Sequence, residues 1–249
     1  MFAQPFAHGR SLLHRLDPRV RLGTAAVSAV CLALVQTRPA ALYGLTLGAG
    51  LLLLSRPPWG TALRRLLAVN LFLLFLCLLT PFSLSGDAVW QWGPLAVTRQ
   101  GLALAFVLWA KSNALVLCFL ALVATMPVST AGYALQKLRC PAKIVFLLLF
   151  AGRYIHDIAD EWRTLLAAAR LRGFRARTSF HTYRTLASLL GILLLRGLDR
   201  ARRVHEAMLL RGFQQRFFCV TPFRAHARDA LFSAFMGAAL IVLCWLEFR

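Results

Sequence analysis

Long uncharged runs dominate this sequence and constrain its fold more than any other feature. A helix needs roughly 17–25 apolar residues to cross a hydrocarbon core of about 30 Å, and only helices or closed barrels satisfy their backbone polar groups there. The runs are rich in Leu, Ala and Phe and lack the polar alternation of barrel strands. They predict an all-α, polytopic membrane protein with about five spans. The uncharged runs are 22–37, 39–55, 66–86, 112–136 and 230–246.

Composition agrees with a membrane protein, because 59% of the residues are hydrophobic and soluble domains have about 45–50% apolar residues. Residues 1–21 are basic and hold no continuous apolar core, so we expect no cleavable signal peptide there. The cysteines show no CxxC spacing and are expected to be small buried hydrophobes rather than disulfide or zinc ligands. They are Cys31, Cys77, Cys118, Cys140, Cys219 and Cys244.

Positive charge is concentrated in the second half of the chain. The net charge is +20, and residues 129–228 alone contain 18 Lys and Arg against 5 Asp and Glu. Cytoplasmic loops of membrane proteins carry such an excess and face anionic lipid, so the bilayer explains the charge better than nucleic acid does. The charges predict membrane-spanning helices over 1–128, a cytoplasmic helical region over 129–228 and a C-terminal transmembrane helix over 229–249, with the N-terminus inside and the C-terminus outside.

Four polar or aromatic residues of the membrane-spanning half need a separate explanation. Lys111 and Asn113 lie inside the predicted fourth span, roughly 101–126, where an ionisable group is costly and is expected to face protein or the interface. Functional and packing roles are both open for them. Trp90 and Trp92 lie in a predicted external loop, where tryptophan commonly anchors a protein at the membrane interface.

The basic region predicts one short helix and two long ones. Ser129 is a suitable N-cap for the short helix, which ends before Cys140. Pro141 suits the start of a long helix over about 142–172, and a second covers about 180–211. Each long helix begins apolar and becomes charged, so we expect both to start against the membrane spans and to end at the cytoplasmic surface.

The two long helices end in a repeated sequence. Residues 168–174 (AARLRGF) align with residues 207–213 (AMLLRGF) at an offset of 39 positions. Glycine is favoured just past a helix end, and a cation on the last turn complements the helix dipole. The Phe that follows the Gly can pack back on the helix or insert into a partner. Two well-capped helices would explain the pattern without any partner.

This repeat resembles the T component of energy-coupling factor (ECF) transporters, in the cobalt/nickel-uptake branch known as CbiQ. In that family, two cytoplasmic coupling helices each end in an Ala-Arg-Gly-like motif that docks on an ATPase subunit. Leu171 and Leu210 stand here in place of the Ala, while the Arg and Gly are retained. Further blocks in the same order are similar to the family: LDPRVRL at 16–22, RYI at 153–155 with the acids at 160–161, and the stretch 200–213.

The resemblance implies a scaffold without catalytic, cofactor or metal residues in the bacterial inner membrane. It would link two cytoplasmic ATPase subunits to a small substrate-binding membrane subunit in an ATP-driven importer of cobalt or nickel. A T component serving vitamin binders is the alternative. The sequence has no GxxxxGK[ST] loop to cradle phosphates. The implied ATPase-docking residues are Leu171, Arg172, Gly173, Phe174, Leu210, Arg211, Gly212 and Phe213.

Acidic residues on the first long helix permit two other hypotheses. His156 and Asp160 have the i, i+4 spacing of a metal site, and Asp157, Asp160 and Glu161 could hold Mg²⁺ in a membrane transferase. The transferase chemistry usually needs a second acidic cluster, and the acids outside 157–161 are isolated. The simpler interpretation is a solvated helix face with an Arg153–Asp157 ion pair.

Overall fold

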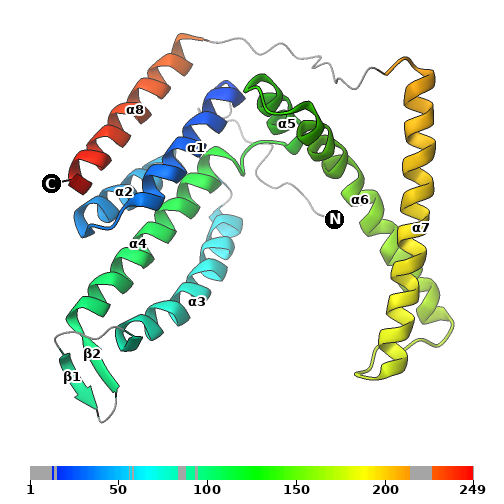
Figure 1. Cartoon of the computed structure of the whole chain (residues 1–249), viewed down its shortest axis with the longest axis horizontal. Coiled ribbons are helices and arrows are strands. Elements are labelled where there is room, and N and C mark those ends of the chain that lie inside the picture. Colours follow the sequence, from blue (N-terminus) through cyan, green and yellow to red (C-terminus); the bar gives the residue numbers. More distant parts are fainter. Residues whose placement is uncertain are drawn as a thin grey trace. The chain divides into compact units, whose positions relative to one another are not determined.

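The structure is a computed structural model, and it divides into two compact units that are described separately below (Figure 1). It describes residues 13, 16–55, 57, 59–83, 88–92, 95–213 and 226–248, with side chains left out over 81–97. One unit, the membrane unit, contains the described residues up to Leu138 together with residues 226–248. The other, the helix-pair unit, contains the described residues from Arg139 to Phe213.

Six helices and a short hairpin make up the membrane unit. The helices are α1 (Pro18–Leu34), α2 (Arg38–Ser55), α3 (Trp59–Ser83), α4 (Arg99–Leu122), α5 (Val128–Lys137) and α8 (Ala227–Phe248), and the hairpin pairs β1 (Ala88–Trp92) with β2 (Leu95–Thr98). Among the described residues, α2, α3, α4 and α8 are long and apolar enough to span a membrane. The prediction of a helical multi-pass membrane protein is therefore confirmed.

The remaining predicted span, α1, has 17 residues. At 1.5 Å per residue it is roughly 26 Å long, slightly short of a typical hydrocarbon core. Asp17 caps its first turn by accepting a hydrogen bond from the backbone N–H of Arg19 at 2.9 Å. Arg21 is buried near the start of the same helix and donates to the backbone carbonyl of Leu122 at 2.9 Å and to the hydroxyl of Thr125. The start of α1 is thus fastened to the end of α4.

Small residues bring α2 and α4 into close contact. A Cβ added at Gly48 of α2 would lie 3.1 Å from the backbone oxygen of Ala114 and 3.1 Å from the Cβ of Leu117, both on α4. Ala110, Ala114 and Ala121 are almost fully buried in the same core. Apolar lipid supplies little hydrophobic driving force between spans, so such small-residue packing is the usual way they associate.

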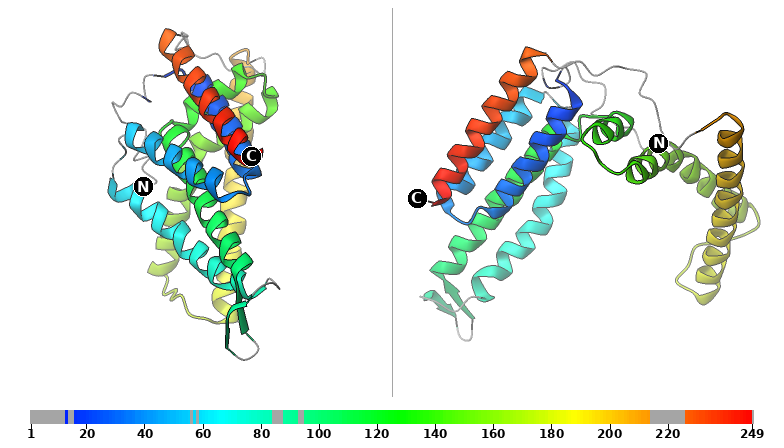
Figure 2. Two further views of the ribbon diagram at one scale, coloured as in Figure 1. Left: turned by 90° about the vertical axis from the view of Figure 1, so that its left-hand side faces the viewer. Right: turned by 45° about the horizontal axis from the view of Figure 1, so that its top comes forward.

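Helices α1 and α8 lie side by side and run in the same direction (Figure 2). At their starts, the backbone N–H of Asp17 donates to the carboxylate of Asp229 at 2.8 Å. At their ends, Glu247 accepts hydrogen bonds from the backbone N–H groups of Gln36 at 2.9 Å and Thr37 at 3.1 Å. Two parallel helices that begin at the same end of the unit are what the expected topology requires, while its sidedness stays a prediction.

Lys111 and Asn113 both make packing contacts. The Lys111 ammonium donates to the backbone oxygen of Val35 at 3.2 Å, just past the end of α1, where the helix dipole favours a cation. The side-chain amides of Asn113 and Asn70 exchange two hydrogen bonds of 2.8 and 3.0 Å between α4 and α3. The indole N–H of Trp109 adds a third, to Asn70 at 3.0 Å. These contacts favour the packing role for both residues.

The β-hairpin was not predicted from the sequence. It falls in the expected external loop, and its strands pair antiparallel with a register shift between Ala88 and Trp90. Trp90 and Trp92 lie on β1, but their side chains are outside the described part of the structure, so their anchoring role stays a prediction. The described cysteines are free thiols. Cys118 is buried in the core as predicted, the other described ones are half-buried, and Cys219 lies outside the described residues.

Candidate partner-docking site

Two long helices, α6 (Ala142–Leu171) and α7 (Phe180–Leu210), form the helix-pair unit and agree with the predicted bounds to within a residue. Pro141 precedes α6, and the hydroxyl of Ser179 caps α7 by accepting from the backbone N–H of Thr182 at 3.3 Å. The short helix α5 of the membrane unit differs from its prediction. Pro127, not Ser129, is the N-cap, and it makes no side-chain hydrogen bond there.

Both long helices end in the same hydrogen-bonded turn. After α6, the N–H of Gly173 donates to the carbonyl of Arg170 at 3.0 Å and that of Phe174 to Ala169 at 3.1 Å. This pair of bonds is the Schellman motif, which needs a left-handed residue after the helix. Gly173 supplies it with φ of +85°, a conformation that glycine adopts without steric cost.

The end of α7 repeats this turn residue for residue. Gly212 donates to Leu209 at 2.9 Å, Phe213 donates to Met208 at 3.0 Å, and the φ of Gly212 is +74°. The aligned sequence repeat therefore corresponds to two copies of one local structure. Because α7 runs back along α6, the two copies lie at opposite ends of the helix pair (Figure 1).

The predicted docking residues differ in how far they reach into solvent. Leu171 and Leu210, each directly before the Arg, are 91% and 90% exposed, and Arg172 and Arg211 are also exposed. The same apolar and cationic side chains are thus presented at matching places on both helices. The structure groups the eight predicted residues into two separate ends with one local conformation.

The two phenylalanines lie closer to the helices. Phe174 and Phe213 are half-buried, and the ring of Phe213 packs against Phe146 of α6 with centroids 5.8 Å apart. Phe213 therefore packs back, as one of its two predicted alternatives states. The Leu and Arg of each end are thus more exposed than the Phe that follows the Gly.

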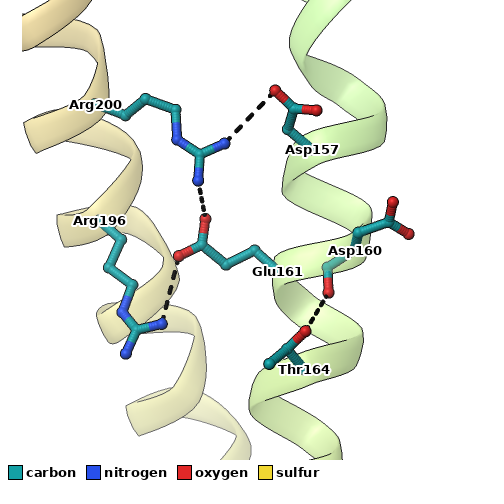
Figure 3. A network of polar contacts seen from close by, with 6 residues as sticks. All are labelled: Asp157, Asp160, Glu161, Thr164, Arg196 and Arg200. Atoms are coloured by element: carbon teal, nitrogen blue, oxygen red, sulfur yellow. Dashed lines mark hydrogen bonds and ion pairs between the residues drawn. The ribbon is translucent and has the colours of Figure 1, made fainter.

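An ion-pair network joins α6 to α7 (Figure 3). The Arg200 guanidinium lies 2.8 Å from the Glu161 carboxylate and 3.6 Å from Asp157, and Arg196 lies 3.5 Å from Glu161. Asp157 was expected from its spacing to pair with Arg153 on its own helix, but its ion pair is with Arg200 across the helix pair. Sequence spacing alone could not find this partner, which is 43 positions away.

The network also bears on the metal and transferase hypotheses. Asp157 and Glu161 each contact a guanidinium group, so the carboxylates that would bind Mg²⁺ are engaged by arginine instead. Asp160 pairs with Arg163 one turn along α6 at 3.0 Å. Within the described residues there is no group of three His, Cys, Asp or Glu side chains placed to hold a metal ion.

Next to the network, an apolar groove of about 380 Å³ lies between α6 and α7. One wall is a row of aromatic side chains on α6. Phe146 packs against Phe150 with tilted rings at 4.4 Å, and Phe150 stacks on Tyr154 at 5.7 Å, both measured between ring centroids. The other wall includes the small residues Gly197 and Ala201 of α7. The four-residue spacing of the aromatic side chains is the sequence signal that could have predicted this wall.

Comparison with known proteins decides the family. The sequence model of the cobalt transport protein family, CbiQ, matches residues 9–218, which is most of the chain. The chain belongs to this family. It is thus a T component of the ECF transporter type, as the repeated helix ends indicated, and a multi-pass membrane protein.

Individual relatives of the CbiQ family support the same assignment. The energy-coupling factor transporter transmembrane protein EcfT of Limosilactobacillus fermentum is 28% identical over 217 residues, covering 82% of this chain and 80% of the relative. The cobalt transport protein CbiQ of Rhodobacter capsulatus is 32% identical over 126 residues, about half of each chain. The nickel permease LarQ of Lactiplantibacillus plantarum is 26% identical over 124 residues, 50% of this chain and 43% of the relative.

Proposed function

We propose that this chain is the transmembrane scaffold of an ATP-driven ECF importer and transmits movement from two ATPase subunits to a substrate-binding membrane subunit. The observation that carries the proposal is the pair of matching helix ends, each with an exposed Leu and Arg before a left-handed Gly. Two equal contacts suit a partner made of two equal subunits related by a two-fold axis.

Each end offers a partner two kinds of contact. Arg172 and Arg211 present guanidinium groups, which bind carboxylates through a planar fork of donors and stay charged at all physiological pH values. Leu171 and Leu210 add apolar side chains that gain by burial in a pocket. An ATPase groove lined by acidic and apolar side chains would complement both. The Schellman turn fixes the direction in which these side chains leave the helix.

The scaffold role implies that the chain performs no chemistry by itself. Its relatives are membrane subunits of transporters, and its sequence lacks the phosphate-binding loop of an ATPase. The acidic side chains with the best spacing for Mg²⁺ form ion pairs with arginine. ATP hydrolysis would belong to the partner subunits.

For the transported substrate we propose cobalt, with nickel as the close alternative. The cobalt protein CbiQ and the nickel permease LarQ are both relatives, although each matches about half of this chain. A T component that serves vitamin binders is the second candidate, because the EcfT relatives, whose names specify no metal, match over more than 80% of the chain. A T component contacts the binding subunit rather than the substrate, so the partner decides which substrate is carried.

Co-expression with candidate ATPase subunits and a candidate substrate-binding membrane protein from the same genome tests the proposal. We expect the three proteins to co-purify in detergent and, in vesicles, to take up radioactive Co²⁺ or Ni²⁺ only with ATP. The isolated chain is expected to hydrolyse no ATP and to show no micromolar Co²⁺ or Ni²⁺ binding by calorimetry. Failure to co-purify, or metal binding by the chain alone that is lost in His156→Ala, would overturn the scaffold role. ATP-driven uptake of a vitamin instead of a metal would replace the substrate and keep the scaffold.

A further inference from the structure

The ion pairs between α6 and α7 follow the same 39-residue offset as the repeated helix ends. Glu161 and Arg200 are 39 positions apart, and so are Asp157 and Arg196. The offset that superimposes the end of α6 on the end of α7 therefore also matches each acid of the network with one of its arginines. The repeat extends beyond the helix ends to the place where the two helices meet.

The pattern of contacts has the form of a local two-fold axis. In a two-fold contact, if residue i touches residue j of the other copy, then j touches i. Glu161 pairs at 2.8 Å with Arg200, the residue that the 39-residue offset matches to it. A contact between two matched residues maps onto itself, so it lies on the axis. The two remaining contacts, Asp157 with Arg200 and Glu161 with Arg196, exchange with one another under the offset, and their lengths of 3.6 and 3.5 Å are nearly equal.

The two helix ends are equally far from this central pair. Arg172 lies eleven positions after Glu161, and Arg211 lies eleven positions after Arg200. Both stretches are continuous helix up to Leu171 and Leu210, so each arm is roughly 16 Å long. Equal arms turn a rotation at the centre into equal displacements of the two ends.

Ion pairs join the two helices at the centre, and the nearest buried apolar side chain of α6 is Leu165, one turn further on. Glu161 is the most buried member of the network, with a side chain 15% exposed, while Asp157 and Arg196 are 53% and 55% exposed. The adjoining Gly197 and Ala201 line the open groove, and a Cβ on Gly197 would meet no atom within 4 Å. Ion pairs tolerate a change of crossing angle that close packing would resist.

We propose that the Glu161–Arg200 pair is the pivot of a two-fold helix cross, aligned with the two-fold axis of the ATPase pair, so that both docking ends move by equal amounts. The proposal rests on the proposed function for its partner. The pivot itself is a property of this chain alone, which allows the two to be tested apart. Glu161, Arg200, Asp157 and Arg196 are positioning residues in this arrangement, because they act through Arg172 and Arg211.

The test exchanges charges across the pivot and measures the distance between the arms. Spin labels at Ala167 and Glu206, which are exposed and 39 positions apart, report the arms in a background without native cysteines. The variant Asp157→Arg/Glu161→Arg places four cations at the pivot. Adding Arg196→Asp/Arg200→Glu restores all three ion pairs, now with the cations on α6 and the acids on α7. Asp160→Arg/Arg163→Asp, an exchange of a pair on α6 outside the network, is the matched control.

In the complex with the ATPases we expect ATP to shift the native label distance as a single narrow population. The four-cation variant should lose this shift or broaden it at least twofold, while the ATPases still co-purify. The full exchange and the matched control should both show the native shift. Retention of the shift in the four-cation variant, or its absence in the full exchange, would overturn the pivot.

Glu161→Gln in the isolated chain tests the pivot without any ATPase and without adding charge. Its label distances should be broader than those of the native chain, because the central ion pair is lost while the side-chain volume is kept. An unchanged distribution would overturn the pivot even if the ATPases bind. Broadening combined with no ATPase binding by the native chain would instead support the pivot and refute the proposed function.

Discussion

The membrane unit and the helix-pair unit are both built from long helices, but they hold those helices together in different ways. In the membrane unit, α4 buries eleven residues, most of them small or apolar, against its neighbours. In the helix-pair unit, α6 buries three residues and α7 buries one, and three ion pairs link the two helices at their crossing. Close packing fixes a helix in one place, whereas ion pairs at a crossing leave its angle adjustable. The first unit suits a fixed frame and the second a moving part.

The largest effect in a test of this difference is expected from charge reversal at the ends of α6 and α7. Arg172→Glu and Arg211→Glu should each abolish transport and weaken ATPase binding by about 2–5 kcal/mol, because an acidic partner loses its cation and meets a like charge. The thermal stability of the chain itself should not change, since both side chains are exposed. Co-purification and scanning fluorimetry measure the two quantities.

Charge reversal just past the motifs is the control for these variants. Arg177→Glu and Arg216→Glu change the same net charge and should weaken binding much less. Arg216 lies outside the described residues, so this expectation for it comes from sequence position alone. Lysine at 172 or 211 should restore binding only in part, because it supplies charge without the guanidinium fork. Equal losses in all four reversals would mean that bulk charge matters and not a specific dock.

A larger side chain at a close helix contact in the membrane unit should lower the stability of the chain, which the reversals at the helix ends leave unchanged. Gly48→Val forces atoms against the backbone oxygen of Ala114 and the side chain of Leu117, so we expect it to lower the unfolding free energy by about 1–3 kcal/mol. Gly50→Val on the same helix is the matched control, since a Cβ there meets nothing within 4 Å. Thermal unfolding in detergent checks both. Equal melting temperatures for the two variants would contradict the close α2–α4 contact.

The hydrogen-bonded amide pair between α3 and α4 should contribute less to the stability of the membrane unit than the close α2–α4 contact does. Asn70→Ala and Asn113→Ala should each cost about 0.6–1.7 kcal/mol, the usual range for a hydrogen bond between spans. A double-mutant cycle should give a favourable coupling energy, because the two amides bond each other. If the two single losses simply add, the side chains do not interact in the membrane.

The smallest effect is expected at the exposed leucines. Leu171→Ala and Leu210→Ala should weaken ATPase binding by about 1 kcal/mol or less, since part of the apolar burial is lost while the charge remains. Leu194→Ala, at another exposed site in the middle of α7, should leave binding unchanged. Stronger loss in Leu171→Ala than in Arg172→Glu would make the apolar side chain, rather than the arginine, the main contact.

Prediction from the sequence succeeded where a local rule decides the structure. The start of α6 follows from Pro141 and the ends of α6 and α7 from two glycines, each of which acts within a few residues. Four of the five predicted spans, α2, α3, α4 and α8, follow from length and hydropathy. The repeated helix end was accessible for the same reason, because its Schellman turn is encoded in seven consecutive residues.

Prediction failed where distant residues compete. Asp157 had a suitable arginine one turn away, yet it pairs with Arg200 of another helix, which no spacing rule identifies. Asn113 and Lys111 could be assigned to packing only once Asn70 and the end of α1 were seen beside them. Ser129 is a good cap by composition, but α5 already begins at Val128, after Pro127. The short hairpin formed in a loop too brief to show a strand period.

The parallel contact between α1 and α8 has a consequence for how the chain is made. A ribosome delivers α1 first and α8 last among the described helices, with the whole α6–α7 region synthesised in between. Leu243 of α8 reaches the core beside Gly44 of α2, and Glu247 satisfies the backbone between α1 and α2. The packing of the membrane unit is therefore incomplete until α8, its last helix, has been inserted. Until then, the surface of α1 and α2 that α8 covers stays unpaired in the membrane. A chain that terminates before Ala227 should therefore be degraded by membrane quality-control proteases.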